Sequence, residues 1–76
     1  MNNRDKDAIR KEAEYLAQSE IYATRFSARL ESARAELVEA YMVAELYAKT
    51  TAMHTRRTIN RVDFILEALH DARGQS

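Results

Sequence analysis

Hydrophobic positions along the chain fall into three stretches with helical spacing. The first covers about residues 7–19, with Asp7 as the predicted N-cap, and its apolar face consists of Ile9, Ala13, Leu16 and Ala17. Residues 20–27 interrupt the pattern with a run of β-branched and aromatic side chains, which favours an extended loop. Ser27 is then the predicted N-cap of a second helix.

The second stretch is the longest, because no breaker occurs before about Thr55. It predicts a helix of about 28 residues and about 42 Å. Its apolar positions form two rows on different faces: Leu30, Ala33, Leu37, Tyr41, Ala44 and Ala48 in one, and Val38, Met42, Leu46 and Met53 in the other. Two short helices of the same chain cover only part of such a rod, so a partner chain is expected to cover the rest.

The third stretch follows a short polar connection over residues 55–60. Asn60 and Asp63 are spaced as at a helix start, and the predicted third helix runs from about Arg61 to Arg73. Its apolar face consists of Val62, Ile65, Leu66 and Leu69. The chain is therefore predicted to be one all-α domain over residues 1–76, with a short helix, a loop, a long central helix, a loop and a short helix.

Composition agrees with a small helical protein that needs a partner. The 76 residues include one glycine, no proline and no cysteine. A core of this size rarely supplies more than about 3–5 kcal/mol, and without cysteine neither a disulfide nor a cysteine-based zinc site adds to it. Oligomerisation is the remaining source of stability. No apolar run approaches the length of a membrane span and no signal peptide is visible, so a soluble, intracellular protein without membrane contact is expected.

Charge is balanced overall but unevenly distributed. Twelve Lys and Arg residues oppose twelve Asp and Glu residues. Residues 4–11 carry four basic and two acidic side chains, and residues 49–61 carry four basic and none acidic, whereas residues 12–48 carry three basic and seven acidic. A net charge of zero is unusual for a protein that wraps a polyanion, so any affinity for nucleic acid is expected to be limited.

Several short motifs stand in the order and spacing of a histone fold: Leu16-Ala17-Gln18, Arg25-Phe26, Glu39-Ala40-Tyr41-Met42-Val43, Ala52-Met53-His54 and Arg57-Thr58-Ile59. Together they resemble core histone three, and residues 56–63 resemble archaeal histones and core histone four even more. The resemblance spans about residues 8–73. It implies a tailless, single-domain histone whose fold forms a head-to-tail handshake dimer.

The resemblance also implies a set of DNA-binding residues at paired loops of the dimer. Arg25 would enter the minor groove, steadied by Thr58 of the other chain, and phosphate contacts would come from Arg57, Arg10, Lys11 and Arg61. The implied function is compaction or bending of duplex DNA without sequence specificity. The implied location is the chromosome or nucleoid of an archaeal or bacterial type of cytoplasm, with the nucleus or a virion as alternatives.

Two further sets of residues have structural roles in the resembled family. Arg56 and Asp63 would clamp the second loop to the third helix. His54, Asp63 and Leu66 would join dimers into a tetramer or a longer assembly. One residue is missing between His54 and Arg56 relative to the family, which rotates a helix by about 100°. Met53 is therefore the alternative at this contact, and a solvated His54 is another.

No enzyme, cofactor or metal site is predicted. His54 and His70 are not spaced as metal ligands, and Ser27 has no nearby base or glycine-rich oxyanion turn. The tyrosines and phenylalanines have helical spacing, which favours packing over base stacking. An alternative function stays open, namely a histone-fold subunit that binds a heterodimer partner in a transcription or chromosome-segregation complex. Neutral charge favours this alternative, whereas Arg25, Arg57 and Thr58 favour DNA binding.

Overall fold

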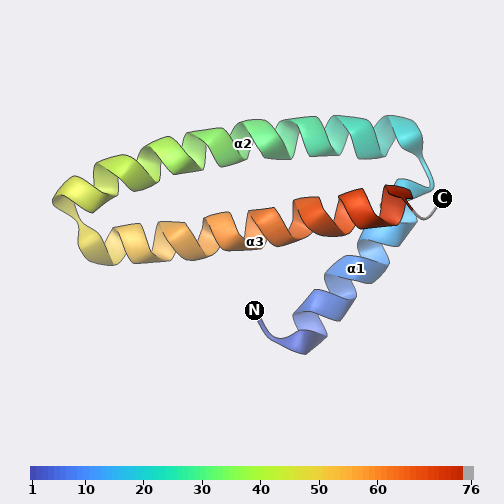
Figure 1. Cartoon of the computed structure of the whole chain (residues 1–76), viewed down its shortest axis with the longest axis horizontal. Helices are drawn as coiled ribbons and strands as arrows, with labels where there is room; N and C mark the ends of the chain where they lie inside the picture. The colour runs from blue at the N-terminus through green and yellow to red at the C-terminus, as the bar shows by residue number, and fades with distance from the viewer. Residues whose placement is uncertain (75–76) are drawn as a thin grey trace.

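The computed structural model describes residues 1–74 and places nearly all of them in three helices (Figure 1). Helix α1 spans Asn3–Ala17, α2 spans Glu20–Tyr47 and α3 spans Lys49–Gly74. Helices α2 and α3 lie side by side as a long antiparallel hairpin, and α1 crosses the hairpin at the end where α2 begins and α3 finishes. The all-α class is confirmed, since every element in residues 1–74 is a helix.

Helix α1 begins earlier than the sequence pattern predicted. The side chain of Asn2 accepts a hydrogen bond from the backbone N–H of Asp5 at 2.8 Å, so Asn2 is the N-cap. Asp7 lies inside the helix and pairs with Arg10 at 3.3 Å, one turn further on. The prediction of Asp7 as the cap was wrong because Asn2 supplies the same kind of acceptor one turn earlier.

The predicted first loop, residues 20–27, is helical, and the true N-cap of α2 is Ser19 instead of Ser27. The Ser19 hydroxyl accepts a hydrogen bond from the backbone N–H of Tyr22 at 3.4 Å. Ala23 is completely buried, and the Arg73 guanidinium donates to Glu20 at 2.6 Å and to the Thr24 hydroxyl at 3.2 Å. Tertiary contacts therefore hold this β-prone run in a helix, and local propensity was a poor guide.

The chain reverses at Ala48, where the pattern predicted an uninterrupted helix. Ala48 is the single residue between α2 and α3, with φ −152° and ψ 77°. Its N–H donates to the carbonyl of Ala44 at 2.7 Å, and its own carbonyl accepts from Ala52 at 2.9 Å. Neither glycine nor proline marks this position, so no local signal announces the turn.

The predicted second loop, residues 55–60, is also helical and lies within α3. The Thr55 and Thr58 hydroxyls donate to the carbonyls of Thr51 and His54, at 2.9 and 3.2 Å, so these polar side chains are satisfied within the helix. The buried residues of α3 keep helical spacing through the segment: Ala52, Ile59, Val62, Ala68, Leu69 and Ala72. The chain thus has one short helix followed by two long ones, in place of a long central helix between two short ones.

The core lies where α1 packs against the end of α3. Its buried residues are Ala13, Ala68, Leu69 and Ala72, with Ile9, Leu16, Ala17 and Ile65 packed around them. Alanine predominates among the buried residues within residues 1–74, and Leu69, at 2% exposure, is the most deeply buried large side chain there. Such a core brings the helices close together but removes little apolar surface from water.

The molecule is elongated and thin. Its Cα atoms extend over 44 × 26 × 14 Å with a radius of gyration of 14.0 Å, against about 11.4 Å for a compact domain of this length. Its accessible surface is 6030 Å², whereas a monomer of this mass typically exposes about 4,800 Å². The single chain therefore leaves an unusually large surface open to a partner.

Candidate nucleic-acid interface

The crossing of α1 over α3 brings together the two stretches that carry an excess of positive charge. Lys6 and Arg10 reach from α1 toward the Phe64 ring on α3, with the Lys6 Nζ 5.7 Å and the Arg10 Cζ 5.2 Å from its centroid. Beside the ring lies a hollow of about 310 Å³, which we call the basic hollow; its lining is Met1, Lys6, Arg57, Asn60, Arg61 and Phe64. Cations from two helices thus share one surface.

Most of the positive charge at the basic hollow is not neutralised. Within residues 1–74, no carboxylate forms an ion pair with Lys6, Arg57 or Arg61, and both arginines are exposed. Arg10 is paired with Asp7, but both side chains remain more than half exposed. Guanidinium and ammonium groups of this kind are ready donors for phosphate oxygens, and Asn60 adds a neutral polar group.

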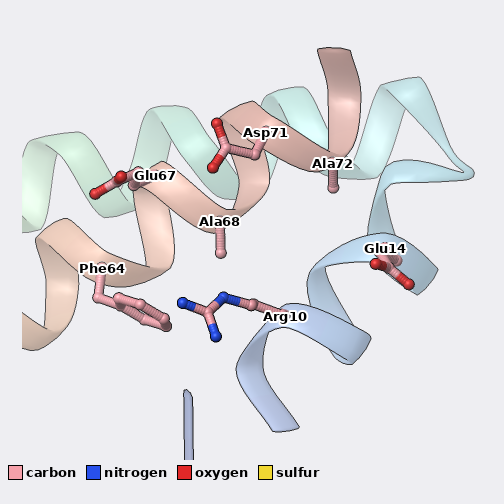
Figure 2. Close-up of a pocket in the computed structure, with 7 residues that line it drawn as sticks. All are labelled: Arg10, Glu14, Phe64, Glu67, Ala68, Asp71 and Ala72. Carbon is pink, nitrogen blue, oxygen red and sulfur yellow. The ribbon is translucent and has the colours of Figure 1, made fainter. Parts of the chain in front are cut away.

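The other side of Phe64 has the opposite character (Figure 2). A second pocket, of about 210 Å³, is bordered there by Arg10 and by the carboxylates of Glu14, Glu67 and Asp71. The Arg10 guanidinium lies next to the Phe64 ring, whereas Glu67 and Asp71 project from α3 further along the helix. Phe64 therefore separates a basic surface from an acidic one, and an anion is directed to the Arg57 and Arg61 side.

Of the predicted DNA-binding residues, Arg57 and Arg61 line the basic hollow together, Arg10 lies at the Phe64 ring on the border of the acidic pocket, and the others join neither group. Arg25 lies on the exposed face of α2 beside Arg29, along a shallow hollow formed by α2 alone. The Thr58 hydroxyl is occupied by the His54 carbonyl. Lys11 is exposed on α1 and does not line the basic hollow. Arg25 and Thr58 thus belong to helices in this chain, and the paired loops that would present them are absent from residues 20–27 and 55–60.

The predicted clamp between Arg56 and Asp63 is wrong for this chain. Asp63 instead forms a bidentate ion pair with Arg34 of α2, through Nε to Oδ1 and through Nη2 to Oδ2, the latter at 3.3 Å. Arg56 and Asp63 lie about two turns apart in one continuous helix, and the structure forms no ion pair between them. The hydrogen bond and charge of Asp63 raise the pKa of the Arg34 guanidinium.

Arg56 has another structural role, since its guanidinium carbon lies 5.7 Å from the centre of the Tyr41 ring on α2. The Tyr41 hydroxyl donates a hydrogen bond to the Glu45 carboxylate. This hydrogen bond raises the pKa of Tyr41, partial burial and the Glu45 charge add to the increase, and Arg56 opposes it. Together with Arg34 and Asp63, this contact ties α2 to α3 along the hairpin.

The residues predicted for contacts between dimers are spread along α3. His54 is exposed, Leu66 is half-buried, and Asp63 is already engaged by Arg34. Twelve residues of helix separate His54 from Leu66 by about 18 Å, so in one chain they do not form a single patch. Their role in a tetramer stays a prediction.

Sequence reasoning missed three residues that shape this surface. Lys6 lies within the basic stretch 4–11, and its place beside Phe64 follows once α1 is known to pack against α3. The helical spacing of Phe64 predicts a packing role. Its position between the two pockets depends on where α1 crosses α3. Arg34 pairs with a residue 29 positions away, for which the sequence holds no local signal.

Comparisons with family models, curated proteins and solved structures yield no match to this chain. No helix within residues 1–74 has the length and apolar character needed to cross a membrane. In the same part of the chain, no group of three or more His, Cys, Asp or Glu side chains is placed to hold a metal ion.

Proposed function

We propose that this protein binds double-stranded DNA without sequence specificity and that the basic hollow makes the phosphate contacts. The observation that carries this proposal is the convergence of Lys6, Arg57 and Arg61 on one surface without carboxylate partners. Contacts from fork-shaped and ammonium donors to phosphate position a protein on duplex DNA but do not read its sequence. The interface differs from the paired loops of the resembled family, because Arg25 and Thr58 belong to helices here.

The functional unit that we propose is a homodimer, in keeping with the head-to-tail handshake implied by the resemblance to histones. Support comes from the excess surface of the single chain and from its exposed apolar side chains, which include Tyr15, Ile21, Tyr22, Leu46 and Tyr47. A dimer presents two basic hollows, and binding at two points on one duplex strengthens attachment and favours bending or compaction. Tetramers or longer assemblies extend the same arrangement.

The affinity is expected to be modest and strongly dependent on salt. Each basic hollow offers three cations, so a dimer would engage about six phosphates. The logarithm of the binding constant would then fall with the logarithm of salt concentration at a slope of about −5. Because the chain has a net charge of zero, its surface outside the basic hollow adds little attraction for DNA.

Arg57→Ala tests the proposal, with Arg56→Ala as its matched control on the adjacent residue. Both changes remove one guanidinium, but Arg57 lines the basic hollow and Arg56 lies over Tyr41. We expect Arg57→Ala to weaken binding to random-sequence duplex and to reduce the salt slope by about one unit per lost contact, with unchanged helicity. Fluorescence anisotropy between 50 and 200 mM salt measures both. Equal losses in the two variants would contradict a site at the basic hollow.

A second candidate is a histone-fold interaction subunit that binds a different protein chain and has little contact with DNA. The observation in its favour is the combination of zero net charge with many exposed apolar side chains. Failure of the wild-type protein to shift duplex DNA at about 50 mM salt, where electrostatic attraction is strong, would favour this candidate.

A further inference from the structure

The connection between α2 and α3 is unusually short for two antiparallel helices. Helical hairpins generally use loops of about two to five residues, whereas here Ala48 alone joins Tyr47 to Lys49. Alanine is the strongest helix former, and the turn contains neither glycine nor a residue with positive φ. The local sequence therefore favours a continuous helix through the point at which the chain reverses.

The tip of the hairpin also exposes a cluster of large apolar side chains. We call these residues the tip patch; their exposed fractions are 62% for Met42, 60% for Val43, 76% for Leu46, 84% for Tyr47 and 58% for Met53. They come from the last turns of α2 and the first turns of α3, on either side of Ala48. Exposed apolar side chains also occur where α1 meets α2, at Tyr15, Ile21 and Tyr22, so the closed chain leaves apolar surface open at both ends of the hairpin.

We propose that the hairpin opens at Ala48 and that two copies of this chain exchange their α3 helices. This inference rests on the dimer of the proposed function and specifies how that dimer is built. In it, α2 and α3 of each chain form one long helix, and α3 packs against α1 and α2 of the other chain. The partner in this exchange is thus a second copy of the same chain.

The contacts that hold the hairpin together would be kept in the exchanged dimer. The pairs Arg34 with Asp63 and Arg73 with Glu20 each join α2 to α3, and both form equally well between chains. The core cluster that contains Leu69 joins α1 to α3 in the same way. Exchange therefore needs no new surface at these places, and every short-range contact within each helix is unchanged.

What the exchange adds is a continuous helix through Ala48, which replaces the one-residue reversal of the chain. Two opened hinges run antiparallel past one another at the twofold axis, in the register that the pair of Arg34 with Asp63 sets. Each basic hollow becomes a joint site, with Lys6 from one chain and Arg57 and Arg61 from the other.

Lengthening the hinge is the first test. A longer loop lets α2 and α3 of one chain pair with each other, and it therefore removes the preference for exchange that the one-residue connection creates. Insertion of four alternating Gly and Ser residues after Ala48 should convert a dimer into a monomer with the same helicity. Sedimentation of the wild-type and inserted chains at micromolar concentration measures this. A monomeric wild-type chain, or an inserted chain that remains dimeric, overturns the proposal.

Mixing two charge variants is the second test, and it distinguishes exchange from any other dimer. Arg34→Asp and Asp63→Arg each place like charges at the contact between α2 and α3 when the chain is closed. In a mixed, exchanged dimer, both contacts again bring opposite charges together. Equimolar refolding should therefore give a dimer that melts above either variant and that forms in excess of random pairing. A mixture that melts as its separate components overturns the exchange.

The chain with both substitutions is the control for this second test. It restores opposite charges in closed and exchanged forms alike, so it should melt above each single variant. If the double variant does not melt above each single variant, the contact between positions 34 and 63 contributes too little stability to report on pairing. The insertion at the hinge then tests the exchange. DNA binding is read separately: an exchanged dimer that fails to shift duplex DNA contradicts the proposed function alone, and a DNA-binding monomer contradicts the exchange alone.

Discussion

The two ends of the α2–α3 hairpin differ in how well the same kind of helix is buried. At the end crossed by α1, Leu69 retains 2% of its exposure, Ala13 retains 5%, and Arg73 is tied to Glu20 at 2.6 Å. At the tip, where two helices meet without a third, Leu46 retains 76% and Tyr47 retains 84%. The crossing helix adds a third wall around Leu69, which the side chains at the tip lack.

This difference also locates the chemistry of the molecule. The helix that buries Leu69 also carries Lys6 and Arg10 to Phe64, so the crossing of α1 creates the core and the basic hollow together. The tip lacks this basic surface and exposes large apolar side chains. The end crossed by α1 is suited to phosphate, and the apolar side chains exposed near both ends are suited to another protein surface.

The largest expected effect comes from truncating the buried end. Leu69→Ala should lower the free energy of unfolding by about 2–5 kcal/mol, which is comparable to the whole stability of so small a core. Leu46→Ala at the tip should change it by less than about 0.5 kcal/mol at concentrations where the chain is monomeric. Urea titrations followed by circular dichroism measure both. Similar losses at the two positions would remove the distinction between the two ends.

A smaller effect is expected for the ion pair that joins the two helices between these ends. Arg34→Ala and Asp63→Ala should each lower the thermal midpoint, and the double variant should lose less than the sum. The two side chains are 41% and 46% exposed, so solvent screening keeps the coupling small. The effects of Arg56→Ala and Asp63→Ala on the thermal midpoint should be additive, because these two side chains do not pair. Coupling in that second cycle, and none in the first, would restore the clamp that the histone resemblance implied.

The smallest effect concerns pH, through Tyr41 near the tip. Its raised pKa means that the protonated phenol stabilises the folded state, fully below the ordinary value of 10.0, with the contribution lost as pH rises through the higher folded value. An ultraviolet titration of the four tyrosines should show one that ionises late, and Tyr41→Phe should remove it. Glu45→Gln should bring the late ionisation toward the ordinary value. A late ionisation that survives Tyr41→Phe would assign the shift to another tyrosine.

Several features followed from local sequence alone. The scarcity of glycine and proline and the spacing of the apolar residues predicted an all-α chain, because helix formation depends on neighbours within one or two turns. The excess of positive charge in residues 4–11 and 49–61 was visible in the same way, and so was the grouping of Arg10 with Arg57 and Arg61 as candidates for phosphate. These properties need no knowledge of which helices meet.

Where the helices begin and end was decided by the tertiary structure. Residues 20–27 and 55–60 look like loops in isolation, but Ala23 and Ile59 are buried between helices, and burial outweighs a weak local preference. Ala48 looks like mid-helix, yet the chain turns there because α2 and α3 can then face each other along their length. The pair of Arg34 with Asp63 and the position of Phe64 between two pockets follow from that packing, since residues far apart in sequence become neighbours only when helices dock.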